Sequence, residues 1–261
     1  MTISEILNRT ASMSPVSDAE YERALNRRER MEPREGVECA KCGNHEYTWV
    51  VRDGERACRV CECKTKRDNL RRLRLSGLSD QVKRCTFASF QTPEQWQETA
   101  KKTVMQFVRD KDRGWLLLSG QPGCGKTHLC TAAAGKFIAA GAETRYMSWV
   151  DESTLLKSCV NDDEEYSRRM DPLKTCRVLY IDDFWKTQRG QNPTPADVKL
   201  AFDLLNYRYC NRQLITMIST ERTAEEMLDI DQGVGSRIYE MTKGYRLEFF
   251  GREKNWRLKN G

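Results

Sequence analysis

One short segment restricts the fold of this 261-residue chain more than any other. The apolar run WLLLS, residues 115–119, leads directly into the glycine-rich loop GQPGCGKT, residues 120–127, which satisfies the pattern G-x-x-x-x-G-K-[ST]. Glycines let such a loop close tightly, so that its backbone N–H groups point inward at phosphate oxygens. The helix expected after the loop directs its positive N-terminal end at the same anion. The sequence therefore predicts a strand, a phosphate-binding loop and a helix in succession.

Two side chains of this loop have chemical roles. Lys126 is predicted to place its positive charge against the β- and γ-phosphates, and Thr127 to offer its hydroxyl to Mg²⁺. The predicted nucleotide contacts run from the first glycine to the residue after the motif: Gly120, Gln121, Pro122, Gly123, Cys124, Gly125, Lys126, Thr127 and His128. ATP and Mg²⁺ are accordingly the first two cofactors that we expect.

An acidic segment is expected to complete this site. Residues 177–184 read RVLYIDDF, in which apolar strand residues end in Asp182 and Asp183. Asp182 is predicted to hold Mg²⁺, directly or through water, and Asp183 to orient or deprotonate the attacking water. The alternative is that two adjacent aspartates simply open a turn. The phosphate-binding loop upstream favours the catalytic interpretation.

The sequence from residue 87 onward alternates between helical segments and short apolar strands. The predicted strands are residues 115–119, 145–149, 178–181, 214–219 and 245–249. Alternation of this kind is typical of a parallel sheet that is flanked by helices. We therefore expect an α/β fold for this part of the chain.

Two weaker features follow later in the chain. The strand at 214–219 ends in a polar tip, Ser219 to Glu221, which could contact a γ-phosphate, although alone it would be only a strand end. Arg237 lies in the segment GSR, at a late position where an oligomeric ATPase places an arginine finger that acts on a neighbouring subunit. A surface ion pair is the alternative interpretation of this arginine.

Five of the eleven cysteines lie within 25 residues of one another. Cys39-x₂-Cys42-x₁₅-Cys58-x₂-Cys61 has the spacing of a zinc ribbon, in which thiolates three residues apart occupy two corners of a tetrahedron. Cys63 is an alternate ligand that could replace Cys61. The sequence thus predicts a zinc site, and zinc is the third expected cofactor.

The predicted zinc site would be structural. Four protein thiolates leave no open position for catalysis, and a module of this size buries too little apolar surface to fold without metal. His45 is a less plausible substitute ligand. A redox-active C-x₂-C pair is the remaining alternative, and it is disfavoured because two pairs occur together.

The positive charge of the chain is concentrated in one stretch. Residues 64–84 hold eight basic and two acidic side chains, an excess of six that equals the net charge of +6 for the whole chain. This stretch is either a solvated linker helix or a surface that faces nucleic-acid phosphates. The expected division is a polar arm at 1–35, a zinc-binding module at 36–64, a basic linker at 65–86 and an ATPase core at 87–261.

The hydropathy of the chain bears on its location. No apolar run approaches the roughly 20 residues of a membrane span, and residues 1–14 lack the basic flank and apolar core of a signal peptide. Thiols stay reduced in the cytosol, which suits the many unpaired cysteines. We expect a cytoplasmic protein with no membrane partner.

Five segments together resemble the DnaC/DnaI-type replicative helicase loaders of the AAA+ superfamily, particularly phage-encoded members, with the IstB-type transposition ATPases as relatives. They are GQPGCGKTHL, VLYIDDF, ITMISTERT, GSRIYE and GREKNWR, and the resemblance covers residues 75–261. It implies a RecA-like AAA+ core and ATP hydrolysis between subunits of an oligomeric ring or spiral. It also implies two partners, a replicative hexameric helicase and single-stranded DNA, with the zinc module engaging the helicase.

The resemblance assigns a role to individual residues. It assigns Walker A to Lys126 and Thr127, and Walker B to Asp182 and Asp183. It assigns sensor 1 to residues 219–221 and the arginine finger to Arg237. Phe87 and Phe90 precede the loop in the segment that lies near adenine in this family, with core packing as the alternative. His128 is typical of the family and is expected to be structural.

Three departures from the family pattern have consequences. Glu221 stands where many relatives have Asn at the sensor-1 tip. Asp183 is shorter than the Glu common at its position, which predicts slow hydrolysis. Only 12 residues follow the last predicted strand, so no helical lid is expected, in keeping with the loader family. A transposition helper ATPase and a non-hydrolysing adaptor that binds zinc and ATP are the alternative functions.

Overall fold

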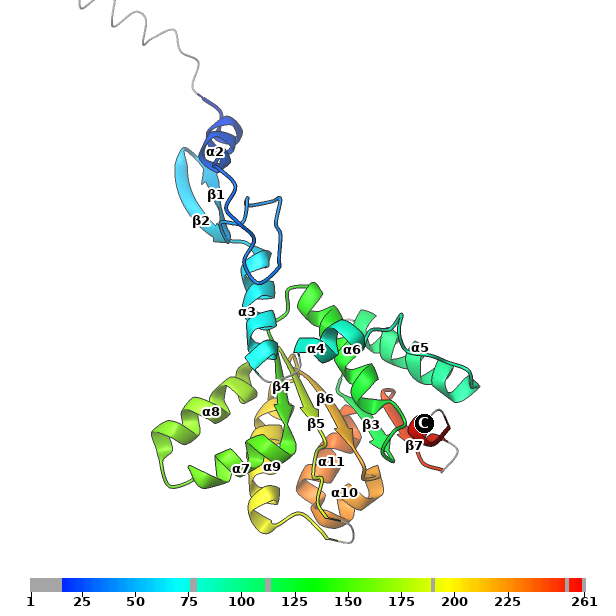
Figure 1. The fold of residues 1–261 in the computed structure, drawn as a ribbon. Coiled ribbons are helices and arrows are strands. Elements are labelled where there is room, and N and C mark those ends of the chain that lie inside the picture. Colours follow the sequence, from blue (N-terminus) through cyan, green and yellow to red (C-terminus); the bar gives the residue numbers. More distant parts are fainter. Residues whose placement is uncertain (1–15, 76–78, 111–113, 189–190, 252–253, 260–261) are drawn as a thin grey trace, which may run out of the picture. The chain divides into compact units, whose positions relative to one another are not determined.

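The computed structural model describes residues 16–75, 79–110, 114–188, 191–251 and 254–259. The chain divides into two compact units, residues 1–68 and 69–261, and each contains a sheet of its own (Figure 1). The first 15 residues of the predicted polar arm lie outside the described residues. None of the described helices combines the length and the apolar character that crossing a bilayer requires.

The first unit is built around an antiparallel hairpin. Strand β1 (Tyr47–Arg52) pairs with strand β2 (Glu55–Val60) along their whole length. Asp53 and Gly54 form the turn, and both have positive φ angles, of 52° and 74°. An Asp-Gly pair with this geometry closes two-residue hairpins, because its twist matches that of the strands. The sequence DG therefore fixes the register of the hairpin.

Helix α2 (Asp18–Asn26) packs beside this hairpin. Ser17 and Glu20 form a capping box that begins the helix. At its other end the Asn26 side chain donates to the backbone carbonyl of Trp49 (2.8 Å) and accepts from the Trp49 N–H (2.9 Å). The second half of the predicted arm is thus joined to the free edge of β1. Helix α3 (Glu62–Leu75) follows the hairpin, and the boundary between the units falls within it.

The second unit contains a five-stranded parallel sheet, which confirms the predicted α/β class. The strands are β3 (Leu116–Gly120), β4 (Thr144–Ser148), β5 (Val178–Asp182), β6 (Ile215–Thr220) and β7 (Arg246–Phe249), in the spatial order β4-β5-β6-β3-β7. Every predicted strand is present within one or two residues of its expected ends. Parallel neighbours require crossover connections, and helices provide them.

Helices cover both faces of this sheet (Figure 1). One apolar core lies under α5 (Gln95–Arg109) and α6 (Lys126–Ala139), and it receives Leu116 and Leu118 from β3. The opposite core receives Leu117. It lies under α7 (Trp149–Ser158), α8 (Asp163–Thr175), α9 (Pro195–Cys210), α10 (Ala224–Ile230) and α11 (Gln232–Met241). Alternate strand residues are buried on opposite faces, so β3 reads as a continuous apolar run.

Two short helices complete the second unit. Helix α4 (Ser79–Arg84) precedes α5, and α12 (Trp256–Lys259) follows β7. Strand β6 lies between β3 and β5, so the carboxyl ends of these three strands converge at one edge of the sheet. This edge is where the loop at 120–127, the two aspartates and the polar tip at 219–221 all begin.

Candidate functional site

The loop at 120–127 connects β3 to α6 and has a backbone that only glycine adopts without strain. Gly120, Gly123 and Gly125 have φ angles of 148°, 81° and 90°. A Cβ atom on Gly125 would lie 2.8 Å from the ring of Phe90. A larger residue at this position would therefore displace the aromatic ring next to the loop.

Hydrogen bonds join the C-terminal segment to this loop. The N–H of Gln121 donates to the carbonyl of Phe249 (3.2 Å), and the Gln121 amide side chain donates to the carbonyl of Gly251. The N–H of Trp256 donates to the carbonyl of Gly123 (3.0 Å). Residues at the far end of the chain thus fix the position of the loop backbone.

Lys126 is buried at the start of α6. Its ammonium group donates to the carbonyls of Gly120 (2.6 Å) and Gln121 (2.9 Å). A buried ammonium needs such partners, since leaving it unpaired is costly. The two carbonyls hold the charge of Lys126 within the loop, where anionic phosphates would be placed.

The acidic segment meets the loop at the edge of the sheet. Thr127 Oγ1 donates to Asp182 Oδ1 (3.2 Å), and the Ser219 hydroxyl donates to the same oxygen. Tyr146 Oη lies 3.4 Å from Asp182 Oδ2. The residues predicted for magnesium, Thr127 and Asp182, are therefore adjacent. A hydroxyl and a carboxylate are oxygen donors that suit Mg²⁺, so the residues present fit this ion.

The carboxylate of Asp183 has different partners from that of Asp182. It has a φ of 53°, and its N–H lies 3.3 Å from Ser219 Oγ. Its carboxylate accepts from the ammonium of Lys186 (2.8 Å), and Lys186 also pairs with Glu221 (3.3 Å). The two adjacent aspartates thus occupy different surroundings, and Asp183 also begins a turn, because its carbonyl accepts from the N–H of Lys186 (3.0 Å).

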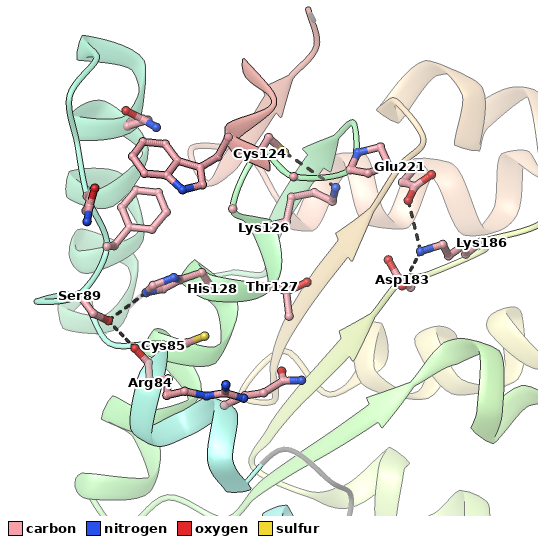
Figure 2. A pocket seen from close by; sticks show the side chains of 18 residues that line it. Arg84, Cys85, Ser89, Cys124, Lys126, Thr127, His128, Asp183, Lys186 and Glu221 are labelled. Carbon is pink, nitrogen blue, oxygen red and sulfur yellow. Dashed lines mark hydrogen bonds and ion pairs between the residues drawn. The ribbon is translucent and has the colours of Figure 1, made fainter. Parts of the chain in front are cut away.

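A cavity of about 600 Å³ lies beside these groups, and Asp183, Lys186 and Glu221 line it, whereas Asp182 is not among its lining residues (Figure 2). Its wall includes loop residues 122–128, Arg84 of α4, Phe90, and Trp256 of α12. Phe87 is buried in the core and does not line the cavity, whereas Phe90 does. Of the two predicted candidates for packing against a base, Phe90 is therefore the one that is placed for it.

His128 lies at the side of this cavity. Its Nε2 atom is 3.0 Å from the carbonyl of Thr86 and 3.3 Å from the hydroxyl of Ser89. The ring packs edge-on against Phe90, with 5.2 Å between centroids. These contacts tie the segment before α5 to α6, and they support the structural role expected for His128.

Arg237 lies on α11 and is not among the residues that line this cavity. Its guanidinium donates to Asn206 Oδ1 (3.1 Å) and to the carbonyl of Gly233 (2.6 Å). It also stacks over the rings of Phe202 and Tyr209, at 4.9 and 5.3 Å from their centroids. The half-buried arginine is thus held against α9 and α11, away from the residues that line the cavity of its own loop.

Sequence comparison identifies relatives of this chain. The sequence profile described as "IstB-like ATP binding protein" matches residues 45–230. The chain belongs to this IstB-like family. In Bacillus subtilis (strain 168), the phage-like element PBSX protein XkdC is 32% identical over 219 residues, which are 80% of each chain. The uncharacterized protein YqaM of the same strain is 32% identical over 195 residues, 71% of this chain and 61% of YqaM.

Solved structures share the fold of this IstB-like protein. The DnaC helicase loader superposes with a TM-score of 0.52 at 21% identity, over 65% of this chain and 97% of DnaC. DnaI gives 0.54 at 18% identity, over 66% and 93%. DnaA from Aquifex aeolicus, bound to AMPPCP, gives 0.52 at 16% identity, over 64% and 50%. The predicted RecA-like AAA+ fold and the family resemblance are confirmed.

Four thiols meet at the base of the hairpin in the first unit of this IstB-like chain. The sulfur atoms of Cys39, Cys42, Cys61 and Cys63 all lie within 4.8 Å of one another. The Cys39–Cys61 and Cys42–Cys63 pairs are 3.7 and 3.4 Å apart. Four sulfurs at about 2.3 Å from a zinc ion would be about 3.8 Å apart. The thiols therefore fit a tetrahedral zinc site.

The predicted set Cys39, Cys42, Cys58 and Cys61 needs one correction. Cys58 is exposed on β2, opposite Trp49, and lies outside the group, whereas Cys63 belongs to it. The hairpin ends at Val60, so the chain reaches the thiol group only after β2 ends. Cys63 enters it from the first turn of α3, and the second pair has the spacing C-x-C.

The surroundings act in opposite directions on the thiols of this group. Although burial opposes ionisation, hydrogen bonds from the backbone and thiol of Cys42 and from the thiol of Cys61 lower the pKa of Cys39 to about 7. Burial raises the pKa of Cys63 well above its usual range. A bound cation would remove this conflict, because thiolates are the ligand form. His45 instead contacts the carbonyl of Glu29 (2.7 Å) and is outside the group.

Arg67 supports the loop that carries the first two thiols. It is 2% exposed and donates to the carbonyl of Val37 (2.8 Å) and to the side chain of Asn44 (3.0 Å). Asn44 in turn accepts from the N–H of Cys39 (2.8 Å). Arg67 was counted in the basic stretch, but its charge is internal to the first unit.

Three residues of the cavity region were not foreseen individually: Tyr146, Lys186 and Trp256. Tyr146 looked like any strand residue, and Lys186 like a solvated lysine. Trp256 lies within the family-like segment GREKNWR, which was the available signal. Burial and the neighbouring Asp182 raise the pKa of Tyr146 well above its usual range, so its hydroxyl remains a donor to that carboxylate.

Proposed function

We propose that this chain is a magnesium-dependent ATPase that loads a replicative hexameric helicase onto single-stranded DNA. The convergence of Thr127, Asp182 and Ser219 at the base of the phosphate-binding loop carries the proposal. The family is described as ATP-binding, and the fold is that of DnaC and DnaI. XkdC, from a phage-like element, is consistent with a phage-type member.

The chemistry follows from the placement of the side chains. Lys126 exchanges its two carbonyl partners for oxygens of the β- and γ-phosphates. Mg²⁺, held by Thr127 and Asp182, would neutralise phosphate charge. Asp183 orients a water and accepts its proton, as the water oxygen attacks the γ-phosphorus and the bond to the departing ADP oxygen breaks. Arg237 of one subunit stabilises the transferring phosphoryl group bound to the next.

The two units would divide the work of loading. The thiol group, once it holds zinc, keeps the hairpin module folded for docking on the helicase. The ATP-bound core would assemble into a spiral that grips DNA, and hydrolysis would release it. Such a cycle requires that the ATP and ADP states differ in affinity for the partners.

Two measurements test this proposal. Magnesium-dependent ATP turnover should be lost in Asp183→Ala, and nucleotide binding in Lys126→Ala. A candidate hexameric helicase should co-purify with the wild-type chain in ATP but not with the Cys39→Ser/Cys42→Ser double variant. Cys58→Ser is the matched control and should behave as wild type. ATP turnover that persists in Asp183→Ala would contradict the proposal. Helicase capture that is unchanged without ATP and in the double cysteine variant would also contradict it.

A transposition helper ATPase is the second candidate function. The family description itself, IstB-like, favours it. Such a protein would capture a transposase and bind duplex DNA, whereas a loader captures a helicase and prefers single strands. A parallel capture experiment with both partners distinguishes the two functions. A non-hydrolysing adaptor is distinguished by the absence of turnover.

A further inference from the structure

Lys186 links two acidic residues at the wall of the cavity. It follows β5, three residues after Asp183, and its ammonium lies 2.8 Å from Asp183 Oδ2 and 3.3 Å from Glu221 Oε1 (Figure 2). The three side chains are 41%, 36% and 33% exposed, and all three line the cavity that also receives Lys126 and Thr127. This ion-pair group is therefore accessible to whatever occupies the cavity.

The backbone holds Lys186 in this position. Asp183 and Trp185 have φ angles of 53° and 54°, in the left-handed region that non-glycine residues rarely adopt. Between them Phe184 is fully buried, and its N–H and carbonyl bond to the carbonyl of Ser219 (2.8 Å) and the hydroxyl of Thr220 (2.8 Å). The turn that carries Lys186 is thus fastened to β6, and Glu221 is the first residue after this strand.

The charges in this group are unbalanced. Two carboxylates share one ammonium, and Asp183 is the carboxylate proposed to act on the attacking water. An ammonium has three donors on a flexible four-carbon chain, so it can change partners without moving the backbone. The γ-phosphate of a bound nucleoside triphosphate carries more negative charge than either carboxylate. A nucleoside diphosphate lacks this group.

We propose that Lys186 is a triphosphate-sensing residue of this site. Without a γ-phosphate it pairs with Asp183 and occupies the carboxylate. With a γ-phosphate it transfers to the phosphate, frees Asp183 for water and remains tethered by Glu221. Glu221, an acid where related sensor-1 tips carry Asn, thus has a role of its own as the second anchor of Lys186. This inference rests on the proposed nucleotide site and adds its discrimination between triphosphate and diphosphate.

The test measures binding and not turnover. The dissociation constants of AMPPCP and ADP are determined by calorimetry with Mg²⁺ for the full chain, for Lys186→Met and for Lys186→Arg. We expect Lys186→Met to weaken AMPPCP binding about tenfold relative to ADP, the ratio that one lost charge-assisted hydrogen bond represents. Lys186→Arg keeps the charge and should restore most of the ratio. Lys102→Met is the control, because Lys102 forms an ion pair with Glu98 on α5, and Lys102 is not among the residues that line the cavity.

A second variant tests the coupling. Glu221→Gln removes the carboxylate that tethers Lys186 beside the γ-phosphate, and it should lower the AMPPCP preference in the wild-type background but not in Lys186→Met. An equal effect in both backgrounds, or an unchanged ratio in Lys186→Met, would overturn the proposal. Failure of the wild-type chain to bind either nucleotide would refute the proposed function itself. Normal binding with no change on substitution would refute only the role of Lys186.

Discussion

Removal of metal should unfold the first unit and leave the second intact. Among the described residues of this unit, Val51 is the one buried apolar side chain besides the cysteines Cys42, Cys61 and Cys63. Burying a valine contributes about 1.5–3 kcal/mol. A structural zinc site contributes about 10–16 kcal/mol at pH 7. The metal would therefore stabilise the module several-fold more than its apolar core does.

The assay is amide hydrogen exchange read by mass spectrometry, with and without a strong zinc chelator. We expect β1 and β2 to lose their protection on chelation, while β3 and β5 keep theirs. Cys63→Ser should reproduce this loss and reduce the zinc content from one ion per chain to none. Cys58→Ser is the matched control, since Cys58 is exposed and outside the thiol group, and it should retain both zinc and protection.

The opposite pattern would refute this reasoning. A hairpin that stays protected after chelation would show that α2 and the backbone hydrogen bonds are sufficient. Zinc retained in Cys63→Ser and lost in Cys58→Ser would return the ligand set to two C-x₂-C pairs. Loss of protection in the second unit as well would mean that the two units do not fold independently.

Three further predictions concern arginines of the chain. Arg208 is fully buried and donates to the carbonyls of four residues and to a threonine hydroxyl. Each stranded acceptor costs about 1–3 kcal/mol, so the loss of all five bonds in Arg208→Leu should lower the free energy of unfolding by about 5 kcal/mol or more in urea titrations, and a loss below about 1 kcal/mol would contradict this. Arg237→Ala should keep nucleotide binding and lose turnover that depends on assembly; full DNA-stimulated turnover would exclude the finger. Reversing the charges of Arg71, Arg72 and Arg74 should weaken DNA binding and flatten its salt dependence, and an unchanged slope would mean that the linker is only solvated.

The sequence was sufficient for the strands and the phosphate-binding loop of the second unit, whereas the start of this unit at residue 69, inside the predicted linker, was not predicted. Buried parallel strands are apolar throughout, and each glycine of the loop motif permits a backbone conformation that the loop requires. The positions of β3, the loop and α6 therefore follow from the sequence. The adjacency of Thr127 and Asp182 also followed, because the ends of parallel strands share one edge of the sheet.

Two details required coordinates. The choice between Cys58 and Cys63 depends on where β2 ends and α3 begins, and spacing alone does not determine that point. Lys186 and Glu221 are 35 positions apart, and their contact depends on a left-handed turn at Asp183 that no propensity predicts. In both cases the contact depends on the local backbone conformation, which residue spacing does not determine.

The brace of the phosphate-binding loop by Phe249 and Trp256 has a practical consequence for work on this protein. The C-terminal segment contacts the loop directly, so a purification tag fused there would disturb the site that an assay is meant to measure. Conversely, the indole of Trp256 lines the cavity, and its fluorescence offers an intrinsic optical signal for ligand occupancy.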